Sequence, residues 1–140
     1  LSGDALDVAR DNGRRLGLDV EFLQGDLFEA LPSRLRGRID LLVSNPPYVA
    51  AGEWDALPAD VRHEPRDALV AGTDGTEILA RIADDAYWWL GIGGHLICEI
   101  GETQGEAVDA LFATFDRGIR QDLTGRDRFV VARKGAACCV

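Results

Sequence analysis

Hydrophobic residues recur along this chain with two different periods, and each period predicts its own kind of element. Apolar residues at helical spacing predict helices over residues 2–16, from Asp74 or Thr76 to 90, and over 103–115, with a short helical turn at 27–31. Alternating or continuously apolar runs predict strands over residues 19–24, 39–44, 95–100, 119–123 and 129–132. This order predicts an α/β layered sheet, whose last strand follows a short turn and runs antiparallel to the strand before it.

The strand predicted at 39–44 ends in an unusual run, Asn45-Pro46-Pro47-Tyr48. Neither proline donates a backbone N–H, and each disfavours the helical conformation in the residue before it. We therefore expect a stiff, extended turn at the carboxyl end of a strand, the place where open α/β sheets bind ligands. An amide, a free carbonyl and an aromatic ring are expected to meet there.

The segment from 49 to 74 has little regular pattern, which is typical of a functional loop or lid. It carries Glu64 and Arg66, and two interpretations stay open. The pair forms a structural salt bridge, or Glu64 lines the entrance of a substrate site. Glycines between the predicted helix ending at 90 and the strand at 95–100 indicate a turn, because a nucleotide-binding loop would follow a strand instead: Gly91, Gly93 and Gly94.

Composition narrows the possible partners. Fifteen basic and 24 acidic residues give a formal net charge of −9, which disfavours nucleic acid as a direct substrate. No apolar run approaches the roughly 18 residues of a membrane span, so no membrane association is expected. Cys98 reads as a small core residue, whereas Cys138 and Cys139 are adjacent and lack metal-ligand spacing. These features predict a reduced, cytoplasmic protein without a metal site.

Four further blocks of sequence accompany the Asn-Pro-Pro-Tyr run, and together they resemble a known family. The blocks cover residues 61–69, 72–75, 99–105 and 122–128. The run itself resembles Rossmann-like, class I S-adenosylmethionine-dependent methyltransferases that act on nitrogen. The blocks in this order resemble the protein-(glutamine-N5) methyltransferases of peptide chain release factors. The resemblance covers residues 1–134, a partial catalytic domain, and leaves 135–140 as a tail.

The sequence also departs from that family. The family's glycine-rich loop after its first strand and the acidic residue after its second strand have no counterpart here. The resemblance implies the sheet order 3-2-1-4-5-7-6, with strands 1 and 2 absent. We therefore expect an incomplete Rossmann-like sheet, mostly parallel with one antiparallel C-terminal strand. Rearranged pairing or a homodimer through the incomplete sheet would fill the gap.

The resemblance implies roles for the residues after the strand at 39–44. The Asn45 side-chain oxygen and the Pro46 carbonyl are expected to accept the two N–H groups of a substrate amide. Pro47 and Tyr48 are expected to line the same substrate site, with Asn45 also touching the cofactor. Tyr48 either stacks on the planar amide or anchors the loop.

Two residues after the strand predicted at 19–24 are implied in cofactor binding. Asp26 resembles the family's acidic residue near the adenine amino group of S-adenosylmethionine, and the Leu27 N–H would face the adenine ring. The alternative for Asp26 is a cap on the turn at 27–31, and both roles are compatible.

The functional hypothesis from the sequence is methyl transfer from S-adenosylmethionine to a glutamine side chain of a release factor. Three alternatives stay open. The substrate is a glutamine of a ribosomal protein, or the reaction is amino methylation of a nucleic-acid base. In the third alternative the chain is a non-catalytic fragment that cannot hold the cofactor.

Overall fold

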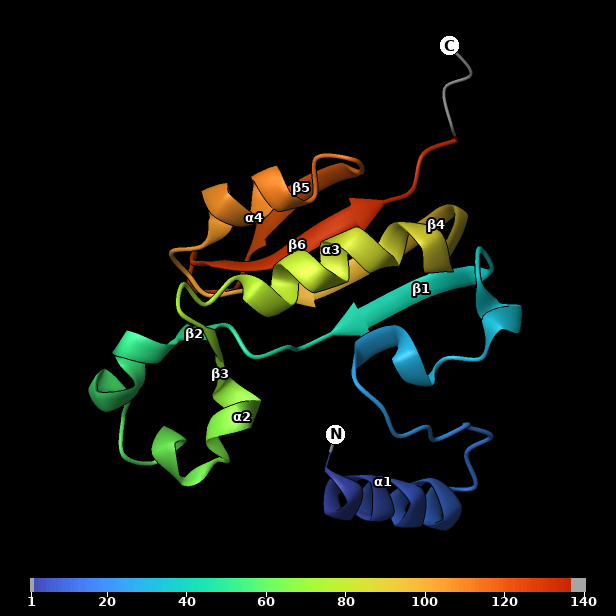
Figure 1. Cartoon of the computed structure of the whole chain (residues 1–140), viewed down its shortest axis with the longest axis horizontal. Helices are drawn as coiled ribbons and strands as arrows, with labels where there is room; N and C mark the ends of the chain where they lie inside the picture. The colour runs from blue at the N-terminus through green and yellow to red at the C-terminus, as the bar shows by residue number, and fades with distance from the viewer. Residues whose placement is uncertain (1, 137–140) are drawn as a thin grey trace. The chain divides into compact units, whose positions relative to one another are not determined.

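The computed structural model describes residues 2–136, and its packing divides the chain into two compact units, Leu1–Leu35 and Arg36–Val140 (Figure 1). Its helices are α1 (Gly3–Leu16), α2 (Arg66–Leu69), α3 (Glu77–Trp89) and α4 (Gly105–Leu111). Its strands are β1 (Ile39–Ser44), β2 (Val49–Ala50), β3 (Val70–Gly72), β4 (Leu90–Glu99), β5 (Asp116–Gln121) and β6 (Asp127–Arg133). Short 3-10 turns complete the chain at Leu27–Ala30, Ser33–Leu35, Ala51–Ala56 and Val61–His63.

A four-stranded sheet forms the centre of the second unit, in the order β1-β4-β6-β5. β1 pairs with β4 in parallel, whereas β6 is antiparallel to both of its neighbours, β4 and β5. β6 therefore runs against the other three strands. This confirms the predicted class, a mostly parallel α/β sheet with one antiparallel strand at the C-terminal end. β1 has one strand neighbour in the described chain, and the homodimer through this edge stays a prediction.

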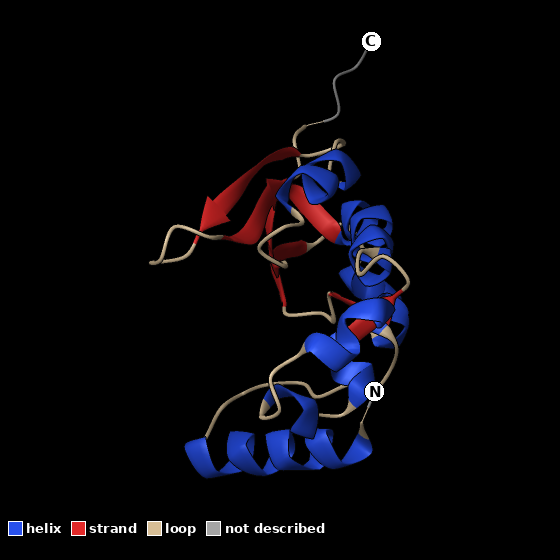
Figure 2. Ribbon diagram, turned by 90° about the vertical axis from the view of Figure 1, so that its left-hand side faces the viewer, coloured by secondary structure: helices blue, strands red, loops and turns tan. Residues whose placement is uncertain are grey.

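The two faces of this sheet differ in what covers them. Figure 2 shows α3 and α4 on one side of the four strands. On that side the core is fully buried and includes Leu79, Ile82, Leu96, Cys98, Val108, Phe112 and Val130. On β1, by contrast, Leu41 and Val43 are 57% and 68% exposed. Burial of apolar side chains at about 25 cal/mol per Å² therefore stabilises mainly the helix-covered side.

The glycines before residue 95 belong to a strand and do not form the predicted turn. β4 begins at Leu90, five residues earlier than expected, and its pairing with β1 shifts register between Ile39 and Leu41. Gly93 has φ +81°, a backbone conformation that glycine adopts without steric cost. Strand pairing with β1 and β6 supplies hydrogen-bond partners for this stretch, and those partners lie far away in sequence.

The segment at 49–74 is more ordered than its composition predicts. β2 and β3 pair in parallel as a small second sheet, with Val49 opposite Val70 and Ala50 opposite Gly72. The chain between them forms 3-10 turns and the single-turn helix α2. The segment is therefore a loop closed at its base by two short strands.

The first unit contains α1, a segment without regular secondary structure and two 3-10 turns. The Ser2 hydroxyl accepts from the Ala5 N–H at 3.3 Å and caps the start of α1, and Gly17 follows its last residue as the C-cap. The strand predicted at 19–24 does not form. The described chain has no regular secondary structure there, and Leu18 and Val20 are more than half exposed. Alternation of residues fixes an extended backbone, whereas a strand also needs a neighbour for its N–H and C=O groups.

Candidate functional site

The candidate site lies where β1 and β4 end. Register pairs Ser44 with Cys98, so Asn45 and Glu99 follow at the same level of two neighbouring parallel strands. Carboxyl ends of parallel strands are the ligand-binding edge of an open α/β sheet. The 45–48 loop, made of Asn45, Pro46, Pro47 and Tyr48, leaves the sheet at this edge.

A pocket of about 500 Å³, named here the Asn45 pocket, opens beside the 45–48 loop. All five residues predicted to bind substrate line it, namely Asn45, Pro46, Pro47, Tyr48 and Glu64. Val49, Leu57, Val61, Ala68 and Leu69 complete the lining with apolar side chains. The structure therefore brings Glu64 from the 49–74 segment to the same cavity as the loop, and the roles of these residues stay predictions.

Within this pocket the side chain of Asn45 is exposed, and none of the described residues forms a hydrogen bond with it. Pro46 is buried and Pro47 is half-buried, so the backbone behind the amide is packed. An exposed amide on a packed backbone presents one oxygen acceptor and two N–H donors to a ligand. The arrangement suits recognition of another planar amide or amine.

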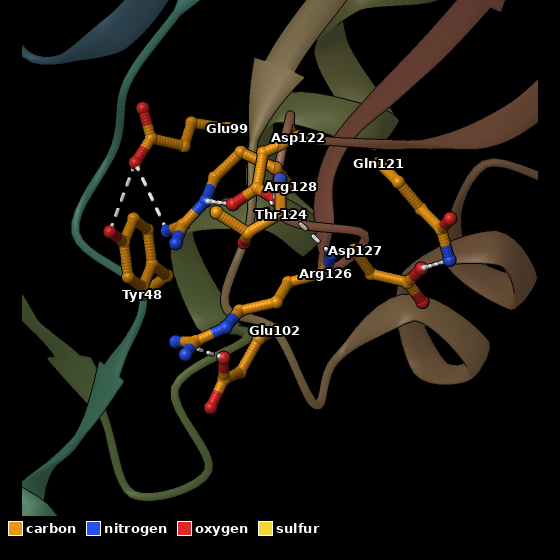
Figure 3. Close-up of polar contacts among 9 residues, drawn as sticks. All are labelled: Tyr48, Glu99, Glu102, Gln121, Asp122, Thr124, Arg126, Asp127 and Arg128. Atoms are coloured by element: carbon orange, nitrogen blue, oxygen red, sulfur yellow. Dashed lines mark hydrogen bonds and ion pairs between the residues drawn. The ribbon is translucent and has the colours of Figure 1, made fainter.

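Tyr48 is fixed through its hydroxyl, as Figure 3 shows. The hydroxyl donates to Glu99 Oε1 at 3.0 Å, and Arg128 Nη1 lies 3.6 Å from the same oxygen. Arg128 Nε lies 3.7 Å from Asp122 Oδ2. Tyr48 therefore anchors the loop, which was one of its two predicted roles, while its ring still lines the Asn45 pocket.

The electrostatics of this network come from burial and from paired charges. Burial, and then the neighbouring Glu99 carboxylate, raise the pKa of the Tyr48 hydroxyl, which therefore stays a hydrogen-bond donor at neutral pH. The Thr124 hydroxyl and the Arg126 N–H donate to the Asp122 carboxylate and lower its pKa to about 2. Asp122 therefore carries a negative charge beside Arg128 at neutral pH.

Tyr48 also lines a second pocket, of about 590 Å³. Tyr48, Val49 and Leu57 line both pockets. Polar groups on its wall include Glu102 and Arg126, which form an exposed ion pair at 3.0 Å. Such an exposed pair contributes about 0–1 kcal/mol to stability.

The salt bridge expected between Glu64 and Arg66 is not formed by these two described residues. The Arg66 guanidinium instead lies over the ring of Trp54, 5.7 Å from its centroid. A planar, weakly hydrated guanidinium stacks favourably on an aromatic face, so Arg66 has a partner within the loop. Glu64 lies on the wall of the Asn45 pocket, and its role at a substrate entrance stays a prediction.

The predicted cofactor residues lie in the first unit. The Asp26 side chain does not cap the turn at Leu27–Ala30, which sets aside its alternative role. Leu27 has φ +45°, a conformation that costs a residue with a Cβ about 1–2 kcal/mol. It is the one non-glycine residue with positive φ in the described chain. Strained backbone of this kind is concentrated at functional sites, which supports a functional interpretation of the turn.

Sequence reasoning gave no role to Gln104, which lies at the start of α4. Its Nε2 donates to the Tyr48 carbonyl at 2.9 Å and to the Gly75 carbonyl at 3.1 Å. Its Oε1 accepts from the Gly101 N–H at 2.9 Å. The only signal in the sequence was its position inside the block 99–105, which carried the resemblance without a role for each residue.

Other classes of site have no support among the described residues. Across residues 2–136 the structure contains no cluster of three or more histidine, cysteine or acidic side chains able to hold a metal. Burial raises the pKa of the Cys98 thiol to about 12, so this cysteine is a neutral core residue. Cys138 and Cys139 lie outside the described residues. No helix in the described part of the chain is long and apolar enough to cross a membrane.

Comparison with known proteins gives relatives of two named activities. A release factor glutamine methyltransferase of Deinococcus radiodurans is 38% identical over 136 residues, which are 96% of this chain and 48% of the relative. One of Bordetella pertussis is 45% identical over 127 residues, 91% of this chain and 46% of the relative. A ribosomal protein uL3 glutamine methyltransferase of Burkholderia pseudomallei is 43% identical over 118 residues, 80% and 38% respectively.

The fold also matches a solved structure, although no protein-family model matches the sequence. A methyltransferase from Pyrococcus furiosus superposes with a TM-score of 0.68, covering 97% of this chain and 60% of that chain at 14% identity. The chain spans about half the length of the first two relatives. Its α/β fold resembles that of this solved structure, and nearly all of its sequence is similar to part of the glutamine methyltransferases named for release factors and for ribosomal protein uL3.

Proposed function

We propose that this chain carries the substrate site of an S-adenosylmethionine-dependent enzyme that methylates a glutamine side-chain nitrogen in a peptide chain release factor. The observation that carries the proposal is the Asn45 pocket, in which the 45–48 loop presents a free amide beside a packed proline backbone. The named activities of relatives at 38% and 45% identity support the substrate class. Its reducing, cytoplasmic setting is part of the proposal and rests on the cysteine pattern.

The residues of the loop supply what this reaction needs from a protein. A glutamine amide nitrogen is a weak nucleophile, because its lone pair is delocalised into the carbonyl. The Asn45 side-chain oxygen and the Pro46 carbonyl accept its two N–H groups and orient the nitrogen. Both hydrogen bonds strengthen as positive charge develops on that nitrogen, so they favour the transition state over the ground state. The half-buried Tyr48 ring and the apolar wall line the cavity that would receive the amide.

The 26–27 turn, made of Asp26 and Leu27, fits the adenine end of S-adenosylmethionine by chemical type. A carboxylate accepts from an exocyclic amine, and a backbone N–H donates to a ring nitrogen. The positive φ of Leu27 marks this turn as a conformation maintained despite its cost. When bound, the cofactor would supply an electrophilic methyl group on a sulfonium.

The second candidate substrate is a glutamine of ribosomal protein uL3, which the 43% identical relative supports. The block at 99–105 and the block at 122–128 favour the release factor, because they resemble that branch of the family more closely. Nucleic acid is a weaker candidate, since a net charge of −9 repels a phosphate backbone.

Transfer of a radioactive methyl group from S-adenosylmethionine, with release factor and uL3 offered in separate reactions, tests the proposal. We expect labelled release factor, and loss of the label in a release factor whose target glutamine is replaced. Asn45→Ala should lower the rate by about 10²–10³, the effect of losing one contact made in the transition state.

The matched control is Asn12→Ala, a change of the same size at an exposed position of α1. An Asn45→Ala protein with an unchanged rate would contradict the assigned role of the loop. No transfer to either protein, together with no calorimetric binding of S-adenosylmethionine, would instead support a non-catalytic fragment.

A further inference from the structure

Gln104 uses a single side-chain amide to join three separate loops. Its two N–H groups bond the carbonyls of Tyr48 and Gly75, and its oxygen accepts from Gly101. A primary amide has two N–H donors, so both are occupied. The partners lie at the end of the 45–48 loop, in the turn before α3 and in the turn after β4. These three turns are far apart in the sequence, and the side chain of Gln104 links them in the folded chain.

The turn at Gly75 is shaped to allow this contact. Gly75 has φ +79°, and a Cβ at this position would stand 2.6 Å from the Tyr48 carbonyl oxygen and 3.0 Å from Gln104 Nε2. Only glycine permits so close an approach without displacing backbone. Two carbonyl oxygens are thereby brought within reach of one NH₂ group, which neutralises their mutual repulsion by donating to both.

Tyr48 is consequently held at two points. Gln104 fixes its carbonyl, and Glu99 accepts from its hydroxyl at 3.0 Å. Asn45 and Pro46 lie two to three residues earlier on a backbone stiffened by two prolines. A constraint on the Tyr48 carbonyl therefore reaches the Pro46 carbonyl through few rotatable bonds.

We propose that Gln104 is a positioning residue that holds the 45–48 loop so that the Asn45 and Pro46 oxygens keep the spacing of two hydrogens on a planar NH₂ group. The inference rests on the proposed function, because that spacing matters only for a ligand of this shape. Gln104 acts through the Tyr48 carbonyl and does not itself touch the substrate amide.

Gln104→Glu is the sharpest variant, because it keeps the size of the side chain and its acceptor for Gly101. It removes both donors and places a carboxylate against two carbonyl oxygens. We expect kcat for methyl transfer to fall by about 10²-fold, the effect of small misplacement of a reacting group, with a smaller change in KM for the protein substrate. Gln104→Ala removes all three bonds but adds no repulsion, so it should lose no more activity than Gln104→Glu.

Hydrogen exchange provides a readout that needs no activity. In Gln104→Glu, amide exchange in residues 48–53 and 73–76 should become about tenfold faster, while β4 and β6 keep their protection. Gln121→Ala is the control, because it removes an exposed amide whose 3.3 Å bond to Asp127 lies within the β5–β6 hairpin. It should change neither kcat nor exchange in these two segments.

The outcomes separate the two proposals. A parent chain without methyl transfer contradicts the proposed function, while exchange still tests whether Gln104 holds the loop. Near-normal exchange in the loop of Gln104→Glu, or a Gln104→Ala protein worse than Gln104→Glu, would show that the residue only fills space. Faster exchange throughout β4 and β6 would show a general structural role, and either result would overturn the inference.

Discussion

The 45–48 loop follows a paired strand, whereas the 26–27 turn follows a segment without regular secondary structure. The loop follows β1, which pairs with β4, and side chains from β4, β6 and the start of α4 fix Tyr48 at both ends. The turn follows residues 19–24, which pair with no described strand, and its feature is the strained backbone of Leu27. The loop is thus preorganised by residues distant in sequence, whereas the turn is distinguished by the positive φ of Leu27.

This difference predicts different kinetic signatures for the two regions: Asp26→Ala should weaken cofactor binding, whereas Asn45→Ala should lower the rate. A hydrogen bond to a carboxylate contributes about 1.5–3 kcal/mol, so its loss should raise the Kd for S-adenosylmethionine at least about tenfold. The value of kcat at saturating cofactor should change little, in contrast to Asn45→Ala. Calorimetric titration measures the first quantity and steady-state kinetics the second.

Asp19→Ala is the control for this change, because it removes an exposed carboxylate from the same unit. A Kd that is unchanged in Asp26→Ala would remove the turn from the proposed cofactor site. A fall in kcat equal to that of Asn45→Ala would erase the contrast between the regions.

A second comparison concerns the strain at Leu27. Leu27→Gly and Leu27→Ala both delete the side chain, but only alanine retains the cost of positive φ. We expect the glycine variant to be more stable by about 0.5–1 kcal/mol in urea unfolding, after the larger chain entropy of glycine in the unfolded state is allowed for. The order reverses at an ordinary position, so an alanine variant of equal or greater stability would show that Leu27 is not strained.

The smallest expected effect is the pH dependence of the stability that Asp122 contributes beside Arg128. The folded-state pKa of Asp122 is about 2, below its usual value of 3.8. Its stabilising contribution is therefore complete above the usual value and is lost as pH falls towards about 2. The urea midpoints of the parent and of Asp122→Asn should differ near neutral pH and converge over this acidic range. A constant difference would contradict the assignment, and Asp116→Asn, at an exposed position of β5, is the control.

Much of the sheet was predictable, because its strands carry their own signal. The apolar run at 39–44 formed β1 with the expected bounds, and the short turn at 124–127 gave the antiparallel pairing of β5 and β6. The family order 4-5-7-6 was also confirmed by β1-β4-β6-β5. The prediction of a strand at 19–24 was wrong. The alternation of apolar and polar residues is present there, but no described strand pairs with this segment.

The sequence indicated which residues to place at the candidate site, but not which contacts hold them in position. Asn45, Pro46, Pro47, Tyr48 and Glu64 line one pocket, and their roles in binding stay predictions. The role of Gln104 was missed, because its bonds reach residues 29 and 56 positions away. A glutamine at a helix start gives no local sign of three partners in other turns.

The sequence by itself determined the α/β order, the stiff Asn-Pro-Pro-Tyr turn and the likeness to glutamine methyltransferases. These features follow from the local pattern of apolar residues, from the fixed φ of proline and from the residue identities in the four sequence blocks. Tertiary structure alone decided that Glu99 anchors Tyr48, that Glu64 lines the pocket while Arg66 lies over Trp54, and that residues 19–24 form no strand. Each of these depends on which distant group lies within hydrogen-bonding reach, and that distance is set only when the chain folds.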